Sequence, residues 1–201
     1  MTHAVTVQMP PCPIDDGRLV VHQVRAWTDN FSWLLSCPDT GEAAVVDGPE
    51  AKPVLDYCAA QGLRLTTILN THTHRDHIGI NLELSEMGVL NQYRVWGCSS
   101  RASDIPGLTR GVNEGDTVTI GKSTAQVWLT EGHIDGHLSF VFKDAVFCGD
   151  TLFAGGCGYL FDGPPEKMQS SLARLATLPQ ETQVFCAHEY TQDNLRFAWS
   201  V

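Results

Sequence analysis

The sequence His-Thr-His-Arg-Asp-His (72–77) begins one residue after a predicted buried strand, residues 64–70, and it constrains the fold more than any other part of the chain. Its side chains His72, His74, Asp76 and His77 are all of metal-binding type. Histidines two positions apart point to the same side only in extended or looped backbone, and the Asp and His that follow can reach a neighbouring point as the chain turns into a helix. Polar groups this crowded are costly to bury without a cation. The cluster therefore predicts a site for two adjacent metal ions at the end of a buried strand.

Three further candidate ligands each stand just past an apolar run. His133 follows the predicted strand that ends at Leu129, Asp150 closes Val-Phe-Cys-Gly-Asp, and His188 closes Val-Phe-Cys-Ala-His. A rigid strand can aim the loop residue after it into a shared cleft. These three residues are therefore predicted to complete the metal shell.

Hydrophobic periodicity and turn residues predict a layered α/β or α+β fold, with sheets covered by helices. The length of 201 residues favours a single domain, residues 1–201. The first three strands are predicted to be antiparallel. The predicted strands cover residues 19–26, 31–37, 43–47, 64–70, 94–97, 117–120, 124–130, 138–142, 145–148 and 182–186. Helices are predicted at 50–61, at 80–88 and from about residue 191 onward. One more helix is predicted after Pro164, where Met168, Leu172, Leu175 and Leu178 recur at helical spacing.

Four longer motifs carry a resemblance to a known family. They are THTHRDHIG (71–79), EGHIDGHLSF (131–140), FCGDTLFAGGCGYLFDG (147–163) and AHEYTQDNLRFA (187–198). Together they resemble the metallo-β-lactamase superfamily, and within it the glyoxalase II group, the hydroxyacylglutathione hydrolases. The similarity runs from about Val21 to the end of the chain. HxHxDH alone marks the superfamily, whereas the GDTLF, GCG and HEYT pieces point to this branch.

The resemblance implies a four-layer αββα sandwich with the metal site at one edge, between the two sheets. It implies that His72, His74 and His133 bind one metal ion, that Asp76, His77 and His188 bind the other, and that Asp150 bridges both. It also implies that Asp76 helps to orient the nucleophile. Two divalent ions are expected, with zinc as the default and iron or manganese as alternatives, because the residues alone do not separate these metals.

Other histidines can be read as structural. His3 and His22 are expected to be ordinary surface or hydrogen-bonded core residues, and so is His137. The sequence leaves one alternative open: if the loop at 131–140 is shifted, His137 would replace His133 as the ligand.

Such a site predicts acyl transfer to water. Two cations that share a water lower its pKa towards neutrality, so a bridging hydroxide can attack a carbonyl without a side-chain base. A thioester suits this chemistry because the departing thiol has a pKa of about 8.5 and can leave as thiolate. The resemblance therefore implies a metal-dependent thioesterase that cleaves S-2-hydroxyacylglutathione, such as S-lactoylglutathione, or a related acyl thioester. Cys157, between glycines, is interpreted as part of a tight turn rather than as a nucleophile.

The chain departs from the glutathione-specific pattern in two places. Tyr159 stands where these members carry Lys or Arg, and Phe161 stands where some carry a tyrosine that makes a polar contact. Tyr190 matches a family residue that touches the thiol-peptide, so Tyr159 and Tyr190 are the candidate substrate contacts. The chain is also expected to lack the C-terminal helical segment of full-length glyoxalase II. Thioester hydrolysis is accordingly a firmer expectation than glutathione specificity.

Composition excludes several partners. The net charge is −10, from 13 Lys and Arg against 23 Asp and Glu, and this charge disfavours nucleic acid. The sequence contains neither a secretion signal nor a membrane span. Seven cysteines without a CxxC pair predict reduced thiols in a cytoplasmic protein, with an exported protein as the alternative. The resemblance implies that the partner is a small-molecule thioester.

Three alternatives remain at this level. A persulfide dioxygenase shares the fold but binds a single iron through two histidines and an aspartate. A lactonase or β-lactamase would use the same nucleophile on a ring ester or amide. A non-catalytic binding module would be expected to lose ligands, and all seven are present.

Overall fold

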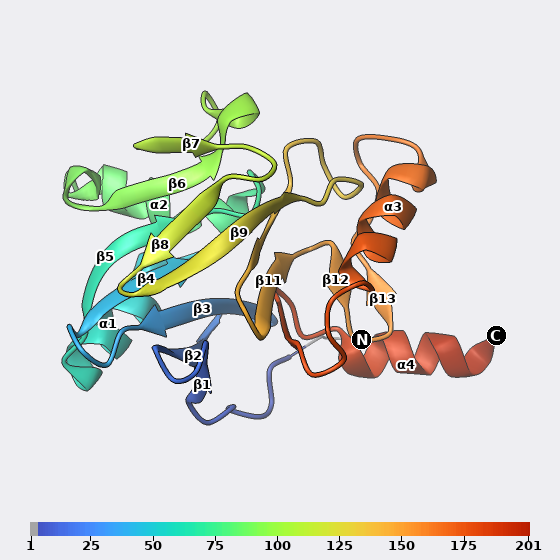
Figure 1. Cartoon of the computed structure of the whole chain (residues 1–201), viewed down its shortest axis with the longest axis horizontal. Helices are drawn as coiled ribbons and strands as arrows, with labels where there is room; N and C mark the ends of the chain where they lie inside the picture. Colours follow the sequence, from blue (N-terminus) through green and yellow to red (C-terminus); the bar gives the residue numbers. More distant parts are fainter. Residues whose placement is uncertain (1–3) are drawn as a thin grey trace.

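The computed structural model describes residues 4–201, and most of its strands form two mixed sheets that pack face to face (Figure 1). The first sheet has the strand order β1-β2-β3-β4-β5-β6-β7, and the second has the order β14-β11-β10-β9-β8. Strands β12 and β13 form a separate hairpin. The strands of the first sheet are β1 (Cys12–Ile14), β2 (Leu19–Ala26), β3 (Asn30–Ser36), β4 (Glu42–Val46), β5 (Arg64–Leu69), β6 (Arg94–Cys98) and β7 (Arg110–Val112). The others are β8 (Thr117–Ile120), β9 (Ser123–Leu129), β10 (Leu138–Val141), β11 (Ala145–Gly149), β12 (Leu152–Phe153), β13 (Gly156–Cys157) and β14 (Gln183–Cys186).

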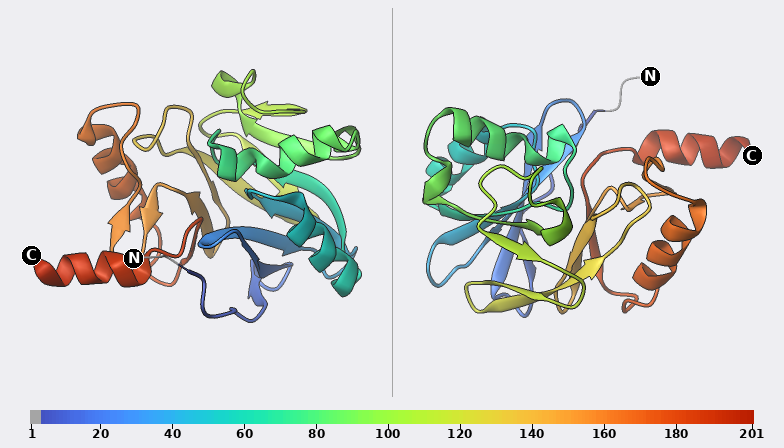
Figure 2. Two further views of the ribbon diagram at one scale, coloured as in Figure 1. Left: turned by 180° about the vertical axis from the view of Figure 1, so that it is seen from behind. Right: turned by 90° about the horizontal axis from the view of Figure 1, so that it is seen from above.

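Helices cover the outer faces of both sheets, which confirms the predicted αββα sandwich (Figure 2). Helices α1 (Ala51–Gln61) and α2 (Arg75–Glu86) pack on the first sheet through a cluster that includes Val54, Ile80 and Leu84. Helix α3 (Pro165–Leu175) packs on the second sheet through Leu175. Two short 3₁₀ turns lie at Leu90–Gln92 and Ser99–Arg101.

The central core lies between the sheets. Phe140 and Phe147 from the second sheet are fully buried there with Leu35 and Leu69 from the first. Burying large apolar side chains is the dominant favourable term in folding, at roughly 25 cal/mol per Å². This core therefore fixes how the two sheets, and the loops at their ends, sit relative to each other.

Parallel strands bring the loops that carry the candidate ligands to the same edge of each sheet. Strand β5 lies parallel to β4 and β6, and β14 lies parallel to β11. The carboxyl ends of neighbouring parallel strands meet at the same edge of a sheet. The segments that follow β4, β5, β11 and β14 consequently converge.

Most predicted elements are confirmed, and the predicted antiparallel order of the first three strands holds for β2, β3 and β4. Helix α2 is the main correction, because it begins at Arg75 rather than near residue 80. The first turn of a helix favours a carboxylate such as Asp76, so the ligand motif and the start of the helix overlap. Strands β1, β7, β12 and β13 were not predicted, because two or three residues are too few to show a period.

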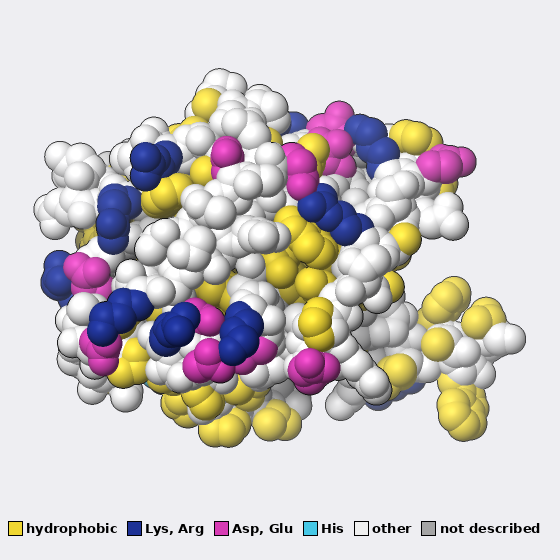
Figure 3. Space-filling model, in the orientation of Figure 1, with side chains coloured by type: hydrophobic (Ala, Val, Ile, Leu, Met, Phe, Trp, Pro, Cys, Tyr) yellow, Lys and Arg dark blue, Asp and Glu magenta, His cyan; other side chains and the backbone are white. Residues whose placement is uncertain are grey.

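Helix α4 (Thr191–Ser200) projects away from the body, at the lower right of Figure 1. None of its described residues is buried, and the apolar side chains of Leu195, Phe197 and Trp199 are exposed, as the apolar surface in Figure 3 shows. Within residues 4–201, no helix combines the length and the apolar character that crossing a bilayer requires.

Candidate metal centre

Three imidazoles from two sheets form a first cluster, which consists of His72, His74 and His133. The loop after β5 carries His72 and His74, and the loop after β9 carries His133. Nδ1 of His74 lies 3.1 Å from Nε2 of His72 and 3.0 Å from Nε2 of His133. Nitrogens bound to one zinc ion at about 2.0–2.1 Å with tetrahedral angles lie roughly 3.3 Å apart. The first cluster therefore has dimensions that fit one metal ion.

A second cluster consists of Asp76, His77 and His188. Asp76 and His77 lie in the first turn of α2, and His188 lies in the loop after β14. Oδ2 of Asp76 is 3.4 Å from Nε2 of His77 and 3.2 Å from Nε2 of His188. The ligand atoms of these three side chains lie within 4.8 Å of one another, so they also could hold an ion.

The carboxylate of Asp150 lies between the clusters. Its Oδ1 is 3.5 Å from Nε2 of both His77 and His188, while its Oδ2 is 3.4 Å from Nε2 of His133. One oxygen thus faces each cluster. A carboxylate placed in this way could reach an ion in either cluster, and the bridging role of Asp150 stays a prediction.

Two buried polar atoms show that the donor set fits divalent metal ions. Nε2 of His77 and Oδ1 of Asp150 are buried and have no hydrogen-bond partner among the described residues. Buried polar groups are almost always satisfied, so such orphans need an explanation. In the first cluster, His74 Nδ1 faces two other ring nitrogens, and a single ring proton cannot satisfy all three. A cation in each cluster removes both conflicts.

Hydrogen bonds behind the histidines fix which ring nitrogen faces inward. His77 donates from Nδ1 to Oδ2 of Asp47 at 2.9 Å, and His133 donates from Nδ1 to the carbonyl of Tyr159 at 2.7 Å. His188 lies with Nδ1 3.3 Å from Oδ1 of Asp29. In all three histidines the other ring nitrogen, Nε2, is directed at the clusters. Outer partners of this kind hold metal-binding histidines in one tautomer and orientation.

Asp47 is the most important functional residue that the sequence analysis missed. It lies just after β4 in a left-handed backbone conformation, with φ of 55°. Its carboxylate accepts hydrogen bonds from the backbone N–H and the hydroxyl of Thr71, at 2.8 and 2.6 Å, in addition to the one from His77. Although Asp47 lies close enough to His72 and His77 to count as a metal-binding group, these three donors already occupy its oxygens. Asp47 therefore holds the candidate ligand His77 and the loop that carries His72 through hydrogen bonds.

Asn30 was also missed. Its side-chain amide donates to Oδ2 of Asp76 at 3.0 Å. Asp29 and Asp47 are single polar residues next to strands, and Asn30 is the first residue of β3. Nothing in their sequence spacing distinguishes them from ordinary turn residues.

The structure favours His133 over His137 as the ligand. His137 is fully buried, but its Nε2 accepts the backbone N–H of Asp150 at 3.2 Å, and its Nδ1 lies 3.2 Å from the hydroxyl of Thr151. Both ring nitrogens are occupied, so His137 supports the loop of Asp150. His22 has a similar core role, with Tyr57 and Ser36 as partners, and His3 lies outside the described residues.

Because His137 is buried, we expect the stability of the protein to depend on pH. Burial lowers the pKa of this imidazole from 6.5 to about 3, so the unfolded chain takes up a proton in that interval and the folded chain does not. Stability from the neutral ring is present above pH 6.5 and is lost as the pH falls towards 3, at up to about 1.4 kcal/mol per pH unit. We expect His137→Gln to show a shallower loss of unfolding free energy between about pH 6 and about pH 4, measured by urea titration with chelator present. Equal slopes in the two proteins would contradict this prediction.

In the two clusters, neighbouring charges shift the pKa values in the direction opposite to the effect of burial. Burial alone would lower the pKa of His188, but the carboxylates of Asp150 and Asp76 raise it to about 9. Burial would likewise raise the pKa of Asp150, yet His77 and His188 hold it well below its usual range. The carboxylates thus remain ionised, which metal binding requires.

Close packing explains the Gly-Gly-Cys-Gly motif. A Cβ on Gly158 would lie 2.1 Å from the backbone oxygen of Asp150 and 2.8 Å from Nδ1 of His133. Gly155 has φ of 71°, in the left-handed region. Cys157 lies in the hairpin strand β13 rather than in the tight turn that was predicted, and the turn is formed by Ala154 and Gly155. The motif therefore lets the backbone pass directly beside two candidate ligands.

Both predicted substrate contacts lie next to the clusters. Tyr190 stacks on His188 with ring centroids 4.9 Å apart and an interplanar angle of 9°, and it is partly buried. Burial raises the pKa of its hydroxyl to about 12. Tyr159 is exposed, and its backbone carbonyl accepts the hydrogen bond from His133.

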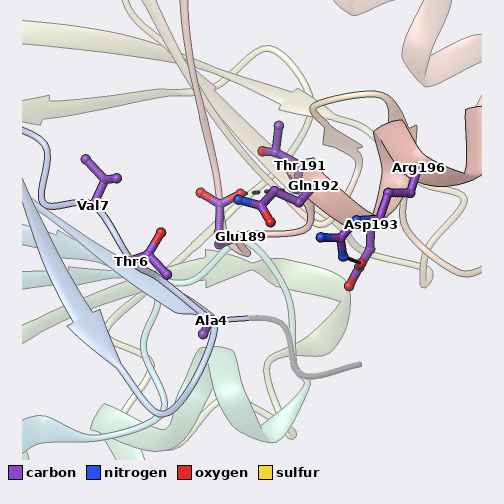
Figure 4. Close-up of a pocket in the computed structure, with 8 residues that line it drawn as sticks. All are labelled: Ala4, Thr6, Val7, Glu189, Thr191, Gln192, Asp193 and Arg196. Carbon is purple, nitrogen blue, oxygen red and sulfur yellow. Dashed lines mark hydrogen bonds and ion pairs between the residues drawn. The ribbon is translucent and has the colours of Figure 1, made fainter. Parts of the chain in front are cut away.

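A surface cavity of about 290 Å³ lies close by, between the N-terminal segment and the start of α4 (Figure 4). None of the seven candidate ligands lines it, so it is not the site of the metal chemistry. The residues around it are Ala4, Thr6, Val7, Glu189, Thr191, Gln192, Asp193 and Arg196.

Comparison with known proteins points to one family. Residues 27–188 match the family model described as the metallo-β-lactamase superfamily. A protein named hydroxyacylglutathione hydrolase from Synechococcus sp. (strain JA-2-3B'a(2-13)) is 48% identical over 183 residues, which cover 90% of this chain and 72% of the relative. One with the same name from Gloeobacter violaceus is 47% identical over 182 residues, with 90% and 71% covered. The crystal structure of ETHE1 from Myxococcus xanthus superposes with a TM-score of 0.71 at 31% identity and covers 85% of this chain and 76% of that one.

Proposed function

Because the chain belongs to the metallo-β-lactamase superfamily, and within it to the hydroxyacylglutathione hydrolases, we propose that it hydrolyses thioesters of 2-hydroxy acids. S-Lactoylglutathione and related acyl thioesters are the candidate substrates. The observation that carries the proposal is the position of Asp150, with one carboxylate oxygen towards each cluster. A carboxylate shared in this way supports a two-metal hydrolytic site.

The first cluster, the second cluster and Asp150 would hold two divalent metal ions, for which zinc is the default proposal and iron or manganese are alternatives. When bound, such a pair lowers the pKa of water and polarises the substrate carbonyl. The chain's own contribution is to hold seven ligand side chains on the ends of rigid strands and on the first turn of a helix.

Asp76 is the proposed catalytic residue among the ligands. Its side chain is 24% exposed, whereas those of His77 and His188 are 1% and 6% exposed, so it is the most exposed side chain of its cluster. The amide of Asn30 holds Oδ2, which leaves Oδ1 available to orient an attacking water. Tyr159 and Tyr190 would contact the substrate.

The proposed reaction needs no side-chain acid. The attacking water loses one proton to solvent as its oxygen bonds to the carbonyl carbon, the C–S bond breaks, and the sulfur leaves as thiolate. The thiolate takes up a proton from solvent, and the carboxylic acid that forms releases its own proton, so one proton is produced overall. Thiols have a pKa of about 8.5, so this departure is easy near neutral pH. An amide nitrogen would need a proton donor, and this requirement favours thioesters over β-lactams.

A substrate panel tests the proposed function. The metal-loaded protein is expected to cleave S-lactoylglutathione much faster than a lactone or nitrocefin. The competing function, a persulfide dioxygenase, predicts oxygen consumption with glutathione persulfide and an iron requirement. The complete second cluster favours hydrolysis. Oxygen uptake without thioester cleavage would overturn the proposal.

We also propose that the protein works in the cytoplasm. Its seven cysteines are all free, and burial raises the pKa of Cys58 and Cys186 to about 11. Thiols of this kind suit a reducing compartment.

A further inference from the structure

A groove of about 540 Å³ opens between the edge strands of the two sheets, with β6 and β7 on one side and β8 on the other. Strands β4, β5, β6 and β7 run parallel, and Glu42, Arg94 and Arg110 in the groove are the first residues of β4, β6 and β7. The loop after β5, which carries two candidate ligands, lies at the opposite ends of these strands. None of the seven candidate ligands lines the groove, so it is a separate site.

Two arginines point into this groove from the inner face of the first sheet. Side chains two positions apart in a strand point to the same face. In β6, Cys98 and Trp96 belong to the core between the sheets, and exposed Arg94 continues that row. In β7, Val112 belongs to the same core, and exposed Arg110 continues its row. The starts of β6 and β7 lie at the left of Figure 1, where Figure 3 shows several Lys and Arg side chains in dark blue.

Most hydrogen-bond donors of both guanidinium groups are available. Within residues 4–201 neither arginine forms an ion pair, and Arg94 makes one long hydrogen bond, at 3.4 Å from Nη2 to the hydroxyl of Thr66. The guanidinium carbon of Arg110 lies over the ring of Trp96, 5.0 Å from its centre. This cation–π contact holds the flat face of the guanidinium and leaves the N–H groups at its edge to bind an anion. Arg110 is therefore preorganised for an oxyanion.

The strand register sets the spacing of the two arginines. Arg110 pairs with Trp96, and Arg94 is two residues before Trp96 in β6. With about 4.8 Å between strands and a rise of about 3.3 Å per residue, the two Cα atoms lie roughly 8 Å apart. Two cations at this spacing repel each other, and an anion bound by both relieves the repulsion. The volume of the groove is in the range of sites for small organic ligands.

Two carboxylates also line the groove, and both already have partners. Glu42 accepts a hydrogen bond from Nη2 of Arg64 at 2.8 Å. Oδ2 of Asp116 accepts a backbone N–H at 2.7 Å. On the other wall, Thr117 and Thr119 of β8 are exposed, so their hydroxyls add two possible donors. The uncompensated charge in the groove is therefore that of the two arginines.

We propose that this groove binds a small organic molecule with a diphosphate group, in which Arg94 and Arg110 each hold one phosphate. A diphosphate offers more acceptor oxygens than a carboxylate, so it can satisfy two guanidinium forks and neighbouring hydroxyls together. The net charge of −10 repels anions at long range, so the affinity comes from these short contacts and falls as salt is added. The site does not depend on the proposed thioesterase function.

Calorimetric titrations of the metal-loaded protein with pyrophosphate, ADP and adenosine test the proposal. We expect the two diphosphates to bind and adenosine not to bind. Arg94→Ala and Arg110→Ala should each weaken ADP binding by about tenfold or more, because each removes charged hydrogen bonds. Arg110→Lys should also weaken it, because lysine keeps the charge but lacks the fork. Arg25→Ala is the matched control: Arg25 is an exposed arginine of β2 without an ion pair in the described part of the chain.

A further variant distinguishes the groove from the metal centre, because bound metal ions can also attract phosphate. Asp150→Ala is expected to lose metal, and it should keep the ADP affinity of the wild type. Loss of ADP binding in Asp150→Ala, with normal binding in the Arg94 and Arg110 variants, would place the diphosphate at the metal centre and overturn the proposal.

Three other results would also overturn the proposal: a wild type that binds neither diphosphate, equal affinity for ADP and adenosine, or equal ADP affinity in Arg25→Ala and the groove variants. Urea titrations check that each variant is folded. If loss of the cover over Trp96 unfolds Arg110→Ala, Arg94→Ala and Arg110→Lys still provide the test. Hydrolysis of S-lactoylglutathione should be unchanged in Arg94→Ala, so failure of this proposal is distinct from failure of the thioesterase function.

Discussion

Asp150→Ala is expected to lose bound metal and thioesterase activity together, with kcat/KM falling far more than the 10–100-fold loss that is typical when an outer partner of a ligand is removed. Asp150 directs one oxygen to each cluster, so the substitution removes a ligand from both proposed ions at once. It also removes one of the two carboxylates that lie beside the buried Nε2 of His77, leaving only that of Asp76. Metal analysis of the purified variant, together with hydrolysis of S-lactoylglutathione, measures both effects.

Two companion variants make this result interpretable. Asp150→Asn keeps the size of the side chain but removes its charge, so retained fold with lost metal would assign the effect to ligation rather than to packing. Asp39→Ala removes an exposed aspartate paired with Lys122 and is expected to behave like the wild type. If Asp150→Ala kept two tightly bound ions, the bridging role would be wrong.

Among the variants proposed here, Asp47→Ala should cause the largest loss of unfolding free energy. Asp47 is 3% exposed and accepts three hydrogen bonds, from the backbone and hydroxyl of Thr71 and from the ring of His77. Removing one partner from a buried, charged network typically costs about 3–5 kcal/mol, because the remaining groups stay buried without partners. We expect a loss of unfolding free energy of this size in urea titrations, and weaker metal binding because His77 loses its orientation.

The backbone at Asp47 needs its own control. Alanine is strained at a φ of 55°, whereas asparagine tolerates this conformation and retains the side-chain volume. Asp47→Asn should therefore show the cost of losing the carboxylate without the backbone cost. Asp56→Ala, at an exposed ion pair with Lys52, should change the unfolding free energy by less than about 1 kcal/mol. A change no larger in Asp47→Ala than in Asp56→Ala would contradict the role given to Asp47.

The fold and the grouping of the candidate ligands could be predicted from sequence because they depend on dense local patterns. Strands such as β2 and β5 show clear apolar runs bounded by turn residues, and the candidate ligands follow such runs directly. Rigid strands then bring His72, His133 and Asp150 together, as their positions after strands predicted.

The supporting residues could not be predicted because their roles depend on tertiary contacts. Asp47 is 30 residues from His77 in sequence, and Asp29 is 159 residues from His188. Neither spacing follows any helix or strand period. The distinction between His133 and His137 has the same origin, since it depends on which ring the backbone of Asp150 occupies.

The two sheets contribute separate halves of the metal centre. The loop after β5 and the start of α2 follow the first sheet, while His133, Asp150 and His188 follow strands of the second. Every proposed coordination sphere thus spans the join between the sheets, so metal affinity reports on the alignment of the two halves of the molecule. A substitution in the core between the sheets, such as Phe147→Leu, should therefore lower the affinity for metal ions, because it shifts one sheet slightly relative to the other. This loss of affinity should appear under conditions in which global unfolding is not yet measurable.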